Sequence, residues 1–111
     1  MTKTSNSDYV PRKDTEFKEW SDPLMVYLKS KLTDFGIPED RYGELSVAHG
    51  NFTTAYAVAI TPETRTPAAI RKKTEMREAF ESMLRKFIAE FITNNSKVTD
   101  WDRENMHVPI H

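Results

Sequence analysis

Apolar residues recur along this chain at intervals of three and four, which is the period of an amphipathic helix. The first such stripe follows Asp14, a residue type that favours helix starts, and ends before Gly36, which supplies a left-handed stop. Its members are Phe17, Trp20, Leu24, Tyr27, Leu28, Leu32 and Phe35. The pattern predicts a first helix over residues 14–35. Because proline removes a backbone donor, we expect a kink or break near residues 19–23, where Pro23 lies.

A second stripe of bulky residues begins after Pro38, which suits the first turn of a helix. It continues until Pro62, which pushes the preceding residue away from helical angles. Its members are Tyr42, Leu45, His49, Phe52, Tyr56 and Ile60. We therefore expect a second helix over residues 38–60, with this stripe in the core.

The third stripe begins at Thr66, a helix cap followed by Pro67 at the first helical position. Its apolar members are Ile70, Met76, Phe80, Met83, Leu84, Phe87, Ile88 and Phe91. Charged pairs spaced four apart occupy the other side: Arg71 with Glu75, Arg77 with Glu81, Glu81 with Arg85, and Lys86 with Glu90. Such pairs are typical of a solvated face. The pattern predicts a third helix over residues 66–94.

A short fourth helix is indicated by Thr99 and Asp102, which have the spacing of a capping box. It covers residues 99–106 and ends before Val108 and Pro109. No useful stretch alternates with period two, so we expect no strand. The predicted fold class is all-α, an up-down bundle of three long helices and a short carboxy-terminal helix.

Chain length and the polar amino end set the expected domain organisation. With 111 residues there is room for one domain with its own core. We expect a flexible amino-terminal segment over residues 1–12, then a single helical-bundle domain over residues 13–111. Trp20, Trp101, the phenylalanines and the methionines are its core candidates.

Composition narrows the possible functions. The chain has no cysteine, which excludes thiolate metal sites and cysteine nucleophiles. Its 16 basic and 17 acidic residues give a net charge of -1, so no global field attracts nucleic acid or an anionic membrane. The polar amino end has no apolar core, and no apolar stretch reaches about 18 residues, so we expect neither a signal peptide nor a membrane span. We expect no nucleic-acid or membrane partner; the compartment stays undetermined, and the cytoplasm is the most compatible.

Short segments of three predicted helices share a pattern with a known group. They are Asp14-x-x-Phe17-x-x-Trp20, Ala55-Tyr56 and the run VTDWDRENMHVP from Val98 to Pro109. In these segments the chain resembles a group of uncharacterised bacterial helical-bundle proteins. The resemblance implies an amino-terminal bundle that ends in a threonine-capped helix and a proline exit, often followed by a β-rich segment. It offers no catalytic residues, and it leaves open whether the chain is a fragment of a longer protein.

The second predicted helix has an unusual charge distribution. Between Glu44 and Glu63 it contains no acidic residue, lysine or arginine, whereas a solvated helix face normally carries charge. At roughly 100° per residue, a stripe of smaller residues lies opposite the bulky one. It consists of Gly43, Val47, Gly50, Thr54, Val58 and Thr61. We call this stripe the small-residue face.

Three interpretations of the small-residue face remain open. It is covered by another part of the chain, which makes the second helix central; or it docks against a second copy or a partner domain; or it is exposed without a role. Small residues permit close approach of two backbones, and interior glycine is otherwise unfavourable in a helix. We take the face as the candidate interaction surface.

Other candidate chemistry is weaker. His107 and His111 are four apart, but Pro109 lies between them, so we expect no metal site. His49 is expected to be a core or boundary residue. Acidic residues at Asp100 and Asp102 are better explained as favourable charges at a helix start than as a calcium loop. The basic residues Arg65, Arg71, Lys72, Lys73 and Arg77 are interrupted by Glu75 and Glu78, which is typical of a solvated helix.

The sequence therefore favours a non-catalytic helical-bundle module with an interaction or structural role. We expect no catalytic residue, cofactor, metal or small-molecule ligand. A homodimer or a partner protein domain is the expected partner, with self-association through the small-residue face as the sharper hypothesis. The alternative is a ligand-binding or enzymatic bundle with a pocket near His49, Tyr42 and Tyr56.

Overall fold

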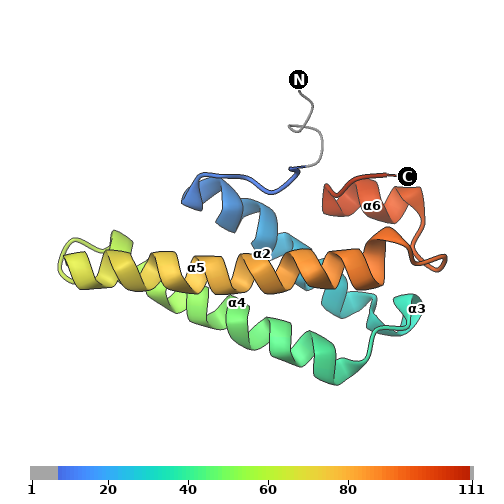
Figure 1. The fold of residues 1–111 in the computed structure, drawn as a ribbon, viewed down its shortest axis with the longest axis horizontal. Helices are drawn as coiled ribbons and strands as arrows, with labels where there is room; N and C mark the ends of the chain where they lie inside the picture. Colours follow the sequence, from blue (N-terminus) through green and yellow to red (C-terminus); the bar gives the residue numbers. More distant parts are fainter. Residues whose placement is uncertain (1–7, 111) are drawn as a thin grey trace. The chain divides into compact units, whose positions relative to one another are not determined.

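The computed structural model describes residues 8–110, and it is helical with no strand in that range. Its elements are α2 (Asp14–Ser30), α3 (Leu32–Phe35), α4 (Glu39–Ile60), α5 (Pro67–Ile88), the π-helix η1 (Ala89–Thr93) and α6 (Asp100–Met106) (Figure 1). The predicted all-α class, with three long helices and a short carboxy-terminal one, is confirmed.

The chain divides into two compact units. The first comprises Met1–Pro38 and Ile88–His111, and the second is Glu39–Phe87. The expectation of a single domain over residues 13–111 stays a prediction. Of the segment expected to be flexible, residues 1–7 lie outside the described residues.

Helix α2 runs unbroken through Pro23, so of the kink or break expected near residues 19–23 the break does not occur. Pro23 is exposed. A proline inside a helix removes one hydrogen bond and crowds the carbonyl four residues earlier, which kinks some helices and ends others. The interruption comes at Lys31, whose N–H donates to the carbonyl of Leu28, three residues back. A second turn, α3, then ends at Gly36, which has the predicted left-handed conformation with φ of 70°.

In the first unit, the apolar side of α2 is buried, and a residue at the edge of this side is hydrogen-bonded to the carboxy-terminal segment. Phe17, Leu24 and Leu28 are buried, as the stripe predicts. Trp20 is half-buried, and its indole N–H donates to the carbonyl of Met106 over 3.1 Å. Burying most of a tryptophan while satisfying its one donor fixes its orientation.

The predicted third helix changes character near its end. It is α-helical through Ile88 and continues as the π-helix η1, instead of as one α-helix to residue 94. The buried guanidinium of Arg103 donates through Nη2 to the carbonyl of Ile92 over 2.8 Å and to that of Thr93 over 3.3 Å. The side-chain amide of Asn95 donates to the Phe91 carbonyl over 2.7 Å. These side chains satisfy carbonyls that the helix end leaves unpaired.

Helix α6 begins with the predicted capping box. The Asp102 N–H donates to the Thr99 hydroxyl over 3.1 Å, and the Thr99 N–H donates to the Asp102 carboxylate over 3.0 Å. The helix ends at His107, which adopts a left-handed conformation with φ of 56°. Trp101 is 65% exposed, so its assignment to the core is wrong. In a helix of two turns that buries its other side, Trp101 falls on the solvent side.

The second unit is an antiparallel hairpin of α4 and α5 (Figure 1). The predicted cap of α5 is confirmed, because the Ala69 N–H donates to the Thr66 hydroxyl over 3.0 Å. Between the helices, the ring of Phe80 lies 6.2 Å from that of Phe52 and 5.1 Å from that of His49, centroid to centroid. The hairpin thus has an aromatic core.

For three residues of the predicted apolar stripes in the hairpin, the prediction of burial is wrong. Ile60, Ile70 and Met83 are exposed, although their stripes predict burial. Ile60 is the last residue of α4 and Ile70 lies in the first turn of α5, both beyond the aromatic core. Met83 lies at the edge of its stripe, where Phe80, Leu84 and Phe87 are buried instead.

Candidate interaction surface on α4

Every residue of the small-residue face is exposed. Val47 is 65% exposed and Val58 is 40% exposed, which are high values for apolar residues on a helix that also contributes to a core. A Cβ atom added at Gly43 or Gly50 would have no neighbour within 4 Å. Within the hairpin of α4 and α5, the small-residue face is therefore left uncovered.

The opposite side of α4 accounts for its burial. Its buried residues are Leu45, Ala48, Phe52, Ala55, Tyr56 and Ala59. Alanine at three of these positions, which the predicted bulky stripe omits, lets neighbouring backbones come close. Helix α4 is thus a two-sided helix whose exposed side, from Leu45 to Ile60, lacks the charges that such a side normally carries.

Two hydroxyl groups at the carboxy-terminal end of this face are hydrogen-bonded within the chain. The Thr61 hydroxyl donates to the Ala57 carbonyl over 2.7 Å, and the Thr64 hydroxyl donates to the Val58 carbonyl over 2.7 Å. A polar group that already has its partner loses less when it is taken out of water. Covering this end of α4 therefore carries a small desolvation penalty.

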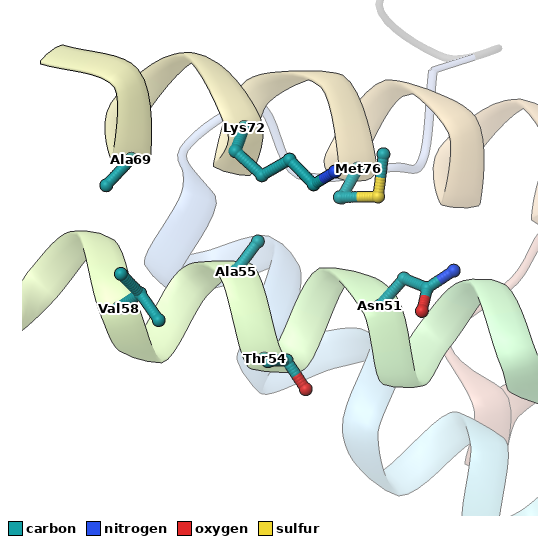
Figure 2. A pocket seen from close by; sticks show the side chains of 7 residues that line it. All are labelled: Asn51, Thr54, Ala55, Val58, Ala69, Lys72 and Met76. Carbon is teal, nitrogen blue, oxygen red and sulfur yellow. The ribbon is translucent and has the colours of Figure 1, made fainter.

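A groove of about 500 Å³ runs along one edge of the small-residue face. It is lined by Asn51, Thr54, Ala55 and Val58 of α4 and by Ala69, Lys72 and Met76 of α5. Figure 2 shows Lys72 lying along the underside of α5, with its amino group directed toward Met76. The groove joins apolar walls to one cationic group, and Thr54 and Val58 belong to both the groove and the small-residue face.

Sequence reasoning missed the α5 wall of the groove. Lys72 was assigned to a solvated helix start, and it is indeed exposed. The available signal was the spacing of Ala69, Lys72 and Met76, which are three and four apart and so lie on one side of α5. That spacing shows a shared side, but only the hairpin shows which part of α4 the side meets.

The alternative pocket near His49, Tyr42 and Tyr56 involves none of the groove residues. His49 and Tyr42 are half-buried, and Tyr56 is buried with its ring 5.7 Å from that of Phe52. Burial raises the pKa of Tyr42. His49 thus takes the boundary position that the sequence predicts, in contact with the aromatic core.

The acidic residues near α6 serve the fold of the first unit. The Tyr27 hydroxyl donates to the Asp102 carboxylate over 2.6 Å, and the Thr99 hydroxyl donates to the same carboxylate over 2.9 Å. Burial by itself raises the pKa of Asp102, but these donated hydrogen bonds outweigh it, and the pKa is lowered. Burial and the bond to Asp102 raise the pKa of Tyr27 to about 12.

The described residues offer neither a metal site nor a membrane span. No cluster of three or more histidine or acidic residues could hold a metal ion there, and His111 of the predicted histidine pair lies outside those residues. None of the helices in residues 8–110 is both long and apolar enough to cross a membrane.

Comparison with known proteins identifies no relative. No protein-family model, curated protein or solved structure matches the chain. The resemblance to bacterial helical-bundle proteins therefore stays a prediction.

Proposed function

We propose that this protein is a non-catalytic interaction module that forms a homodimer through the small-residue face of α4. The observation that carries the proposal is the exposure of every residue of a face that has no acidic residue, lysine or arginine from Val47 to Thr61. Burying the exposed valines of this face is favourable, and no charge on it has to be desolvated.

The spacing of exposed residues on α4 suits a close helix pair. Gly43, Val47, Gly50, Thr54, Ala57 and Thr61 are exposed and follow each other at alternating intervals of four and three. This is the spacing of a coiled-coil seam, in which one side of a helix faces a partner along its length. Because the seam residues are small, the two backbones can lie closer than in a leucine-rich seam.

An antiparallel arrangement makes the seam complementary to itself. With the two-fold axis beside Phe52, Gly43 faces Thr61 of the second copy, Val47 faces Ala57, and Gly50 faces Thr54. Each pair joins a larger residue to a smaller one, as close packing requires. A two-fold interface of this kind uses the same surface on both copies, and so it closes as a dimer.

Sedimentation equilibrium over the micromolar to near-millimolar range tests the proposal. The wild-type chain is expected to show a reversible monomer–dimer equilibrium. Gly50→Glu and Thr54→Arg each place a charge in the seam, and both variants are expected to remain monomeric at the concentrations where the wild type is dimeric. Circular dichroism checks that each variant is folded.

Ala79→Glu is the matched control, because it adds the same charge at an exposed position of α5 that is not part of the face. It is expected to dimerise as the wild type does. A wild-type chain that stays monomeric over the whole range, or seam variants that dimerise normally, would contradict the proposal.

A further inference from the structure

The groove beside the small-residue face carries an exposed cation, Lys72, next to apolar walls. If two copies pair through α4, the groove lies at the edge of their interface, because Thr54 and Val58 belong to both surfaces. The chemistry of the groove then selects what the second copy must place there: a small apolar side chain, and an acidic group near Lys72. The following inference rests on the proposed dimer.

The aromatic contacts of the hairpin fix the position of Lys72 along α4. Phe80 is level with Phe52 and His49, since its ring contacts both. The two helices run in opposite directions, and each rises about 1.5 Å per residue. Lys72 comes eight residues before Phe80 and is therefore level with residues 57–60 of α4. Its place in the groove beside Val58 agrees with this register.

Two-fold symmetry fixes which residue of the second copy reaches the same level. The axis beside Phe52 brings Glu44 of the second copy, eight residues before that point, level with Ile60. Glu44 is exposed, and it lies seven and fourteen residues from the groove residues Asn51 and Val58. Seven residues are about two helical turns, so Glu44 projects from the groove side of α4.

The groove sides of the two copies also face the same way. In an antiparallel pair the two-fold axis is perpendicular to the plane that contains the two helices. Rotation about this axis does not move a groove across the plane, so the grooves of both copies lie on the same side of it. Glu44 of the second copy therefore comes to the Lys72 side of the first copy. Val47 of the second copy, one turn further along, comes level with Ala57 and faces the wall formed by Thr54 and Val58.

We propose that Lys72 and Glu44 form a reciprocal ion pair between two copies, and that the groove seats Val47 of the second copy. Within one chain the pair cannot form, because Glu44 and the level of Lys72 are separated along α4 by about 21 Å. Each dimer contains the pair twice, so its effect on the dimer is doubled. The pair selects the antiparallel register, and the seam provides the apolar contact.

Charge exchange between two variants tests this pair. Lys72→Glu alone places two acidic groups at each contact, and Glu44→Lys alone places two basic groups there. Each variant is expected to dimerise about tenfold more weakly than the wild type at low salt, with a smaller difference at high salt. An equimolar mixture of the two variants restores opposite charges at both contacts, and so it is expected to form heterodimers with nearly wild-type affinity.

Arg71→Glu is the matched control, since it makes the same charge change on the neighbouring exposed residue of α5. It is expected to dimerise within about twofold of the wild type. Sedimentation equilibrium with one variant carrying a fluorescent label measures homodimers and heterodimers separately.

Two results would overturn the ion pair. In the first, both single variants dimerise as the wild type does while Gly50→Glu is monomeric; the dimer of α4 then stands without this contact. In the second, the variants are weakened but their mixture forms no heterodimer. A wild-type chain with no dimer at all would remove the proposed function together with the ion pair.

Discussion

Helices α6 and α4 are stabilised in their units by different interactions. Helix α6 has only seven residues, and hydrogen bonds from Trp20 and Tyr27 fasten it to α2 at both of its ends. Helix α4 has 22 residues and is held by aromatic and aliphatic packing along one side, while its small-residue face is exposed and carries no charge. Short elements need directional polar contacts, whereas a long helix can depend on area alone.

This difference separates residues that stabilise the fold from residues that the folded unit leaves exposed. Around α6, the buried polar groups of Asp102 and Arg103 each have several partners within the same unit. On α4, Val47 and Val58 are exposed, and a Cβ atom added at Gly43 or Gly50 would have no neighbour within 4 Å. The contacts around α6 stabilise its unit, whereas the small-residue face of α4 can change without disturbing the fold.

The largest expected change in unfolding free energy distinguishes the buried side of α4 from its exposed side. Phe52→Ala removes a fully buried ring from the aromatic core and is expected to cost about 3–5 kcal/mol of unfolding free energy. Val47→Ala, on the exposed side, is expected to change the stability of the monomer by less than about 0.5 kcal/mol. Urea denaturation of dilute protein measures both values. Equal losses at the two positions would show that α4 has no free side.

The next effect concerns the polar contact of α6 with α2. Tyr27→Phe removes the hydrogen bond to the buried Asp102 carboxylate and is expected to cost about 1.5–3 kcal/mol near neutral pH. Because the folded-state pKa of Tyr27 is raised to about 12 from 10.0, this contribution is complete below pH 10 and declines as pH rises through 12. The stability difference between wild type and variant, measured by denaturation from pH 7 to 12, should therefore shrink only above pH 10. A difference that is constant to pH 12 would contradict the assignment.

A smaller effect of opposite sign is expected at Ser21 in α2. Its side chain is completely buried, and its hydroxyl has no hydrogen-bond partner among the described residues. Ser21→Ala removes this unsatisfied group and should stabilise the chain by about 1 kcal/mol. Thermal unfolding provides the measurement. A destabilised variant would indicate that the Ser21 hydroxyl is hydrogen-bonded. Ser21 would then stabilise the first unit through a polar contact, as Tyr27 does.

Sequence reasoning succeeded where the determining contacts are local. The capping box of Thr99 and Asp102 and the proline start of α5 at Pro67 depend on residues within one turn, and both are confirmed. The small-residue face was also visible as a run without charges. Its exposure was not, because exposure depends on which segments pack against α4.

Features that depend on distant partners could not be predicted. The π-helix Ala89–Thr93 is completed by donors from Arg103, and nothing near residue 89 indicates them. Tryptophan is a residue type that usually packs in a core, so Trp101 was a natural core candidate. A helix of two turns, however, has too few apolar positions to show from sequence which of its sides is buried. The Lys72 wall of the groove required the register of the hairpin, which the Phe80 contacts supply.

Disulfide cross-linking tests the central claim, the antiparallel pairing of α4, most directly. The chain has no cysteine, so Val47→Cys and Ala57→Cys each introduce a single thiol on the exposed side. In the proposed dimer residue 47 of one copy faces residue 57 of the other, whereas two copies of residue 47 are about 15 Å apart along the helix. Mild oxidation of an equimolar mixture should therefore give a cross-linked dimer containing both variants, and little from either variant alone. Efficient cross-linking of Val47→Cys with itself, or no cross-link in the mixture, would contradict the account.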